Sequence, residues 1–142
     1  MRTLIVAAIA ATAATNIAFA ADAPAPPPGV SSLLVTDATK TISGQPIVVP
    51  TNPHVIVTLT TIAPGAHLPK HIHPYARYGY ILEGAITVTN LETHETYVSK
   101  AGDFVVDLRD QVHEAVNTGT VPVKVLTIDQ VPAGVSTNLV PK

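Results

Sequence analysis

Cysteine and tryptophan are absent from this chain of 142 residues, and charged residues are few. Without cysteine, the protein cannot form disulfides, thiolate metal sites or a cysteine nucleophile, so its fold must rest on a hydrophobic core. With 8 basic and 10 acidic residues and no basic stripe, the chain is not expected to bind nucleic acid. A sustained helical period is also missing after residue 21, whereas 13 prolines and many Val, Thr and Ile residues favour an all-β domain with frequent turns.

The first 20 residues have the layout of a secretory signal peptide. Arg2 supplies a positive start, and the stretch 4–14 is apolar except for Thr12. Ala18 and Ala20 are small residues before the expected cleavage point. The alternative is a membrane anchor, but about fifteen apolar residues are few for a span of about 20. We therefore predict cleavage after Ala20, a mature protein without a membrane span, and a periplasmic or secreted location.

A proline-rich spacer over residues 21–30 precedes the predicted domain, which covers residues 31–142. Short runs rich in β-branched residues alternate with turns along this domain, a spacing typical of a β-sandwich or a closed barrel. The expected strands cover residues 33–35, 47–49, 54–62, 78–82, 85–90, 97–98, 104–106, 113–117 and 121–130. The run 54–62 is the longest, and we expect it at the centre of a sheet.

The densest group of polar and aromatic residues runs from Gly65 to Gly84. Side chains two apart on a strand project from the same face, so His71 and His73 are expected to aim their imidazoles at one point. Two imidazoles can hold a transition metal when a third ligand arrives from elsewhere in the fold. His113, on a later predicted strand, is the candidate for that ligand. The alternative for the three histidines is a polar core without metal.

This arrangement of residues resembles two sequence motifs of the cupin family. The residues that match the first motif are Gly65, His71, His73 and Gly84. The residues that match the second motif are Gly102, His113 and Asn117. The resemblance covers residues 65–117 and implies an all-β double-stranded β-helix, the jelly-roll barrel of cupins. It also implies a metal-dependent activity, such as that of a dioxygenase, isomerase, lyase or decarboxylase.

One position departs from the first motif, because Arg77 stands where cupins carry their metal-binding glutamate. A guanidinium group has no lone pair to offer a metal and stays protonated. Arg77 could bind an anionic substrate beside a three-histidine metal site, could replace the metal and bind an acidic ligand, or could turn outward to solvent. Tyr75, which follows the H-x-H closely, is a further candidate for substrate contact, with packing in the barrel wall as its alternative.

His67 shares the parity of His71 and His73, so on a regular strand it is a candidate fourth metal ligand. The sequence therefore predicts an exported cupin that holds a divalent transition metal (Fe, Mn, Ni, Cu or Zn) through His71, His73 and His113. Its ligand is expected to be a small molecule, and Arg77 favours an anion such as a carboxylate. The alternatives are a binding protein without metal or catalysis, and an assembly role. The resemblance also implies a homodimer, because cupins commonly dimerise through terminal strands.

Overall fold

The computed structural model of the chain describes residues 27–142. The predicted signal peptide, its cleavage site and most of the spacer lie outside these residues. Contacts divide the chain into two units, residues 1–33 and 34–142. In the described part of the first unit, the Val30 N–H donates a hydrogen bond to the Pro27 carbonyl oxygen over 3.0 Å and closes a turn. All the strands of the described residues belong to the second unit.

Residues 27–142 form strands, turns and loops without a helix, which confirms the predicted all-β class. The strands are β1 (His54–Ile62), β2 (His67–Ile72), β3 (Arg77–Glu83), β4 (Ala85–Asn90), β5 (Thr96–Lys100), β6 (Phe104–Val106), β7 (His113–Val116), β8 (Val123–Val131) and β9 (Val140–Pro141). No helix of the length and apolarity needed to cross a membrane occurs in the described part of the chain.

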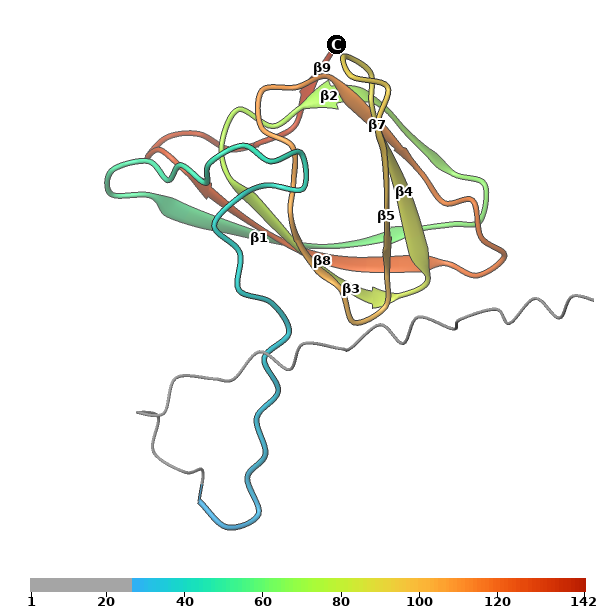
Figure 1. Ribbon diagram of the computed structural model, residues 1–142. Coiled ribbons are helices and arrows are strands. Elements are labelled where there is room, and N and C mark those ends of the chain that lie inside the picture. The colour runs from blue at the N-terminus through green and yellow to red at the C-terminus, as the bar shows by residue number, and fades with distance from the viewer. Residues whose placement is uncertain (1–26) are drawn as a thin grey trace, which may run out of the picture. The chain divides into compact units, whose positions relative to one another are not determined.

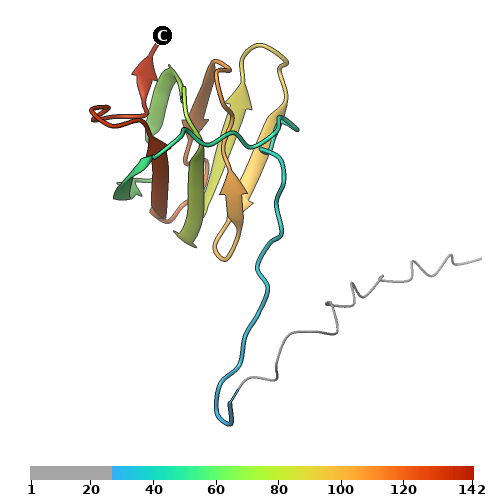
Figure 2. The ribbon, with the colours of Figure 1, turned by 90° about the vertical axis from the view of Figure 1, so that its left-hand side faces the viewer.

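The strands of the second unit form two antiparallel sheets that face each other as a jelly-roll barrel, as the sequence predicts (Figure 1). One sheet has the order β1-β8-β3-β6 and the other the order β5-β4-β7-β2-β9. Most neighbouring strands are far apart in sequence, since β1 pairs with β8 along its whole length and β2 pairs with β7. Figure 2 shows the last strand, β9, beside β2, with which it pairs.

The expectation that residues 54–62 form a central strand is wrong. These residues form β1, which lies at an edge of its sheet, whereas β8 and β3 occupy the centre. Val55, Val57 and Leu59 share one face of β1 and are 53%, 59% and 62% exposed. A run of β-branched residues favours a strand wherever it lies, and it does not distinguish an edge from a centre.

The strands expected at residues 33–35 and 47–49 are absent from the described structure, where the segment before β1 forms one isolated bridge, between Lys40 and Pro46. Pro46 and Pro50 flank the second run, and proline cannot donate to a sheet ladder. Short apolar runs next to proline therefore overstate the number of strands in this protein.

Strand alternation separates the side chains of the barrel into an inner and an outer set. On β3, Gly79 and Ile81 line the interior, whereas Tyr78 and Tyr80 lie on the outer face. The buried apolar cluster consists of Ile62, Ile81, Ile86, Ala115 and Val123. Each fully buried large aliphatic side chain of such a cluster contributes about 1.5–3 kcal/mol to folding. This core supports the histidines that enter the same interior.

The segment before β1 is fastened to the loop that follows β6. The Ile42 N–H donates to the Val106 carbonyl oxygen over 2.8 Å, and Ile42 lines the barrel interior. The Gln45 side chain then bonds the backbone of Arg109 twice, through Nε2 to the carbonyl oxygen (2.9 Å) and through Oε1 to the N–H (3.1 Å). These bonds fix the backbone on both sides of Asp107.

Candidate metal centre

Three histidines from two neighbouring strands meet inside the barrel, as the sequence predicts. His71 lies on β2, His73 directly follows β2, and His113 begins β7. The β2–β7 register places His71 opposite His113. One ring nitrogen of each histidine lies within 4.8 Å of the other two, and the residues are 4%, 1% and 1% exposed. This group can hold a metal ion.

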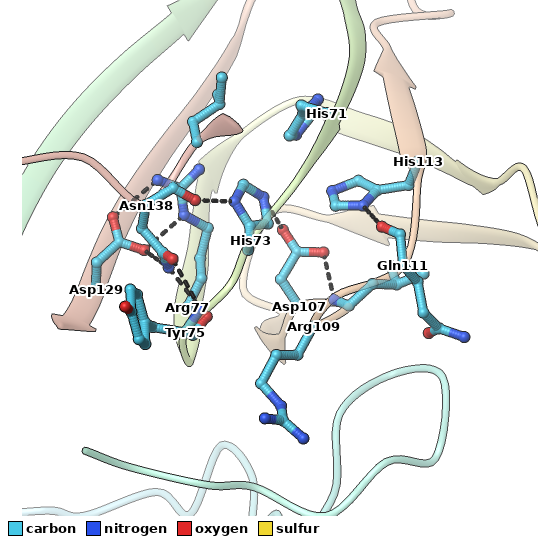
Figure 3. Close-up of polar contacts among 12 residues, drawn as sticks. His71, His73, Tyr75, Arg77, Asp107, Arg109, Gln111, His113, Asp129 and Asn138 are labelled. Atoms are coloured by element: carbon cyan, nitrogen blue, oxygen red, sulfur yellow. Dashed lines mark hydrogen bonds and ion pairs between the residues drawn. The ribbon is translucent and has the colours of Figure 1, made fainter. Parts of the chain in front are cut away.

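Each of the three rings is oriented through its Nδ1 by a backbone carbonyl, two of which Figure 3 shows. The Nδ1 atoms of His71, His73 and His113 lie 2.6, 2.7 and 2.8 Å from the carbonyl oxygens of Pro69, Asn138 and Gln111. A carbonyl oxygen only accepts hydrogen bonds, so in each neutral ring Nδ1 carries the hydrogen and Nε2 presents its lone pair. A carbonyl on the far ring nitrogen is the usual support of a metal-binding histidine.

Burial keeps two of the rings neutral and ready to bind a cation. The pKa of His71 is lowered to about 4, chiefly because burial disfavours the charged ring. Burial likewise lowers the pKa of His113. The buried Nε2 of His113 has no hydrogen-bond partner, an arrangement that proteins seldom tolerate without a ligand or water. Imidazole donors suit zinc, copper, iron and nickel, so the residues present fit a divalent transition metal.

The metal-free protein is expected to lose stability as the pH falls from about 6.5 to about 4. In the unfolded chain His71 is protonated near its ordinary pKa of 6.5, whereas in the folded state its pKa is lowered to about 4. Protons therefore favour the unfolded state throughout this window, and the lowered pKa of His113 acts in the same direction. Urea denaturation at several pH values measures the effect. A His71→Asn variant should lose less stability over the same pH range. A urea midpoint of the wild type that stays constant between pH 6.5 and 4 would contradict the expectation.

Asp107 is a residue of this site that the sequence analysis missed. It follows β6, and its Oδ2 lies 3.4 Å from Nε2 of His73 (Figure 3). Its Oδ1 accepts a hydrogen bond from the Leu108 N–H over 2.8 Å. Burial by itself raises the pKa of Asp107, but its interactions with His73 and His113 hold the net pKa below the ordinary value. A carboxylate therefore stands beside the converging imidazoles.

Arg77 forms a bidentate ion pair with Asp129, its direct neighbour on β8. Its Nε and Nη2 each donate to one carboxylate oxygen over 2.8 Å, and the two side chains are 16% and 2% exposed. Asp129 also accepts a hydrogen bond from Nδ2 of Asn138 over 2.8 Å. Arg77 lines the barrel interior rather than facing solvent, and its charge is balanced by Asp129.

The structure does not bring His67 to the three histidines, because β2 contains a bulge. His67 pairs with Val116, but His71 pairs with His113, so β2 holds one residue more than β7 over this stretch. A single extra residue reverses the parity of a strand. His67 consequently faces outward, where its Nε2 lies 3.5 Å from a carboxylate oxygen of Glu114.

Tyr75 also lies apart from the cavity, whose described lining does not include it. Its backbone N–H and carbonyl oxygen bond the side-chain amide of Asn138 over 2.9 and 3.0 Å. The carbonyl oxygen of the same Asn138 orients His73. Tyr75 therefore contributes through its backbone to the support of the histidines.

A cavity of about 120 Å³ adjoins the histidines inside the barrel. Its polar wall includes the three histidines, Arg77 and Asp107, and most of the remaining wall is aliphatic. An engineered protein cavity of about 150 Å³ holds benzene, so this smaller cavity suits a ligand smaller than benzene.

A family model described as a cupin domain matches residues 58–129, slightly more than half of the chain. Among solved structures, the chain is similar to BH2720 of Bacillus halodurans, with 23% identity, a TM-score of 0.51, and coverage of 61% of this chain and 69% of that one. It is similar to the Cnp3 cupin domain of Schizosaccharomyces pombe, with 19% identity, a TM-score of 0.51, and coverage of 60% and 61%.

An oxalate oxidase in complex with the substrate analogue glycolate matches with 26% identity and a TM-score of 0.47, over 54% of this chain and 42% of that one. The chain thus spans less than half the length of that oxidase. No curated protein matches the chain. The likenesses to BH2720 and to the Cnp3 cupin domain support the fold.

Proposed function

The chain belongs to the cupin family, and on this basis we propose that it holds a divalent transition metal through His71, His73 and His113 and binds a small anionic molecule there. The observation that carries the proposal is the convergence of three buried histidines, of which His113 has a buried Nε2 without a hydrogen-bond partner. When bound, such an ion supplies Lewis acidity or, for a redox-active metal, electron transfer.

The protein's own residues orient the donors and exclude water from them. Backbone carbonyls hold the three rings through Nδ1, so little reorganisation accompanies metal binding. The aliphatic wall of the cavity lowers the local dielectric constant and strengthens electrostatic interactions with a ligand. The same wall limits the ligand to a molecule of a few heavy atoms.

Charge balance at the site favours an anion as that ligand. Three neutral imidazoles leave the two positive charges of the ion uncompensated, and Arg77 and Asp129 cancel each other. Asp107 contributes one negative charge beside the histidines. One positive charge then remains, and a monoanion such as a small carboxylate would neutralise it. The alternative, in which Arg77 replaces the metal, has less support because the Arg77 guanidinium already forms a bidentate ion pair with Asp129.

Acetate is therefore expected to bind the cobalt-loaded protein and to bind the metal-free protein far more weakly. Acetamide, a neutral molecule of almost the same shape, should bind the loaded protein at least about tenfold more weakly, which corresponds to about 1.4 kcal/mol. Isothermal titration of both compounds against both forms measures the difference. Equal acetate affinity with and without metal would contradict the proposal and would favour Arg77 as the anion receptor.

A further inference from the structure

Asp107 has no counterpart in the sequence motifs, yet its carboxylate lies at the histidine cluster. We infer that Asp107 is the fourth protein ligand of the metal and supplies the carboxylate that the first motif lacks at Arg77. This inference rests on the proposed function, because it concerns the coordination of the same ion.

Residues 77 and 107 are neighbours across two paired strands, so a carboxylate at position 107 can take the place of the one that the first motif has at position 77. β3 pairs with β6, and the pair Tyr78–Val106 is the last of their register. One step further, the Asp107 N–H donates to the Arg77 carbonyl oxygen over 2.9 Å. Both side chains line the cavity. A carboxylate at position 107 therefore enters the same part of the barrel as one at position 77 would.

The contact between His73 and Asp107 favours a positive species between the two groups. Nδ1 of His73 lies 2.7 Å from the Asn138 carbonyl oxygen and carries the ring hydrogen, so Nε2 of the neutral ring is an acceptor. Oδ2 of Asp107 is also an acceptor, and it lies 3.4 Å from this Nε2. Two acceptors that face each other repel, and a metal ion or a proton between them removes the repulsion.

The separation of these two atoms favours the metal ion over the proton. An N–H···O hydrogen bond normally spans about 2.7–3.2 Å, so 3.4 Å is long for a shared proton. Nitrogen and oxygen ligands each lie about 2.1 Å from a zinc ion, and a tetrahedral angle between them sets them about 3.4 Å apart. The structure already holds His73 and Asp107 at this separation.

Asp107 is also held in place and free to coordinate. Its Oδ1 accepts the hydrogen bond of the Leu108 N–H, which leaves Oδ2 toward the histidines. Gln45 fastens the backbone of Arg109 just beyond it. The Arg77 guanidinium does not compete for Asp107, because its bidentate partner is Asp129.

The test is cobalt binding by the full chain and its Asp107→Asn variant, followed by visible absorption and by competition with a chelator. The visible bands of Co²⁺ respond to the number and type of its ligands, so they report coordination independently of any activity. We expect Asp107→Asn to shift these bands and to weaken Co²⁺ binding by more than about 100-fold. Loss of a residue that only supports a metal ligand weakens binding by about 10–100-fold. Asp107→Glu, which keeps the carboxylate, should recover part of the affinity. Glu83→Gln is the matched control, since this exposed carboxylate pairs with Lys124 and lies outside the cavity lining.

Unchanged bands in Asp107→Asn would overturn the inference, even with a moderate loss of affinity, because Asp107 would then act only by positioning His73. Failure of the wild-type protein to bind Co²⁺ would overturn the proposed function as well. If Asp107→Asn does not fold, the bands of Asp107→Glu decide, since a changed carboxylate ligand must alter them. The two failures are therefore distinguishable in one set of titrations.

Discussion

Replacing His113 with alanine is expected to abolish tight metal binding while the barrel remains folded. His113 supplies one of three converging imidazoles, and the two imidazoles that remain come from a single chain segment. In the wild type, a metal at 100 times its dissociation constant should stabilise the fold by about 2.7 kcal/mol, because it binds the folded state alone. Added metal should not stabilise the His113→Ala variant. Thermal or urea denaturation with and without added Co²⁺ measures the difference.

His67→Ala is the matched control for this experiment, because it removes a histidine of the same strand as His71. The bulge in β2 turns His67 outward, so this variant should keep the full stabilisation by metal. Equal losses in both variants would contradict the site described here. Retention of the metal effect in His113→Ala would place the ion elsewhere.

Replacing Asp129 with asparagine is expected to destabilise the fold by about 3–5 kcal/mol, the usual effect of removing one partner of a buried ion pair. Asp129 is 1% exposed and accepts two hydrogen bonds from Arg77 and one from Asn138. Without the carboxylate, Arg77 keeps a positive charge inside the barrel. Because Asn138 also orients His73, metal affinity should fall by about 10–100-fold as well.

A double-mutant cycle separates the ion pair from the packing of its side chains. Arg77→Met combined with Asp129→Asn removes both charges, and the double variant should be more stable than Asp129→Asn alone. Urea denaturation of the single and double variants gives the coupling. A loss below about 1 kcal/mol in Asp129→Asn would mean that solvent reaches the pair and screens it.

The sequence predicts the convergence of the three histidines because two of them share a strand face and the third falls at the expected place of a second motif. The same parity argument fails for His67, since the bulge between Leu68 and His71 reverses the face. Pro69 lies inside this irregular stretch, which marks a departure from a regular strand without giving its direction. Local sequence thus sets which residues alternate, and long-range pairing sets which face turns inward.

The roles of Asp107 and Asp129 also could not be predicted from the local sequence. Val105 on β6 and Asp107 just after it both line the cavity, but nothing in the local sequence indicates that these alternate positions face inward. Asp129 neutralises Arg77 across a pairing of β3 with β8, which brings together residues 52 positions apart. Partners at that distance follow from the topology of the barrel. Cleavage after Ala20, export and homodimerisation stay predictions from the sequence.

The most direct test of the metal site is elemental analysis of the wild-type protein after saturation with Co²⁺ and removal of unbound ions, beside His71→Ala and His113→Ala. The site predicts about one equivalent of metal per wild-type chain and close to none in either variant. No bound metal in the wild type, or full retention in both variants, would contradict the assignment of these histidines to a metal centre.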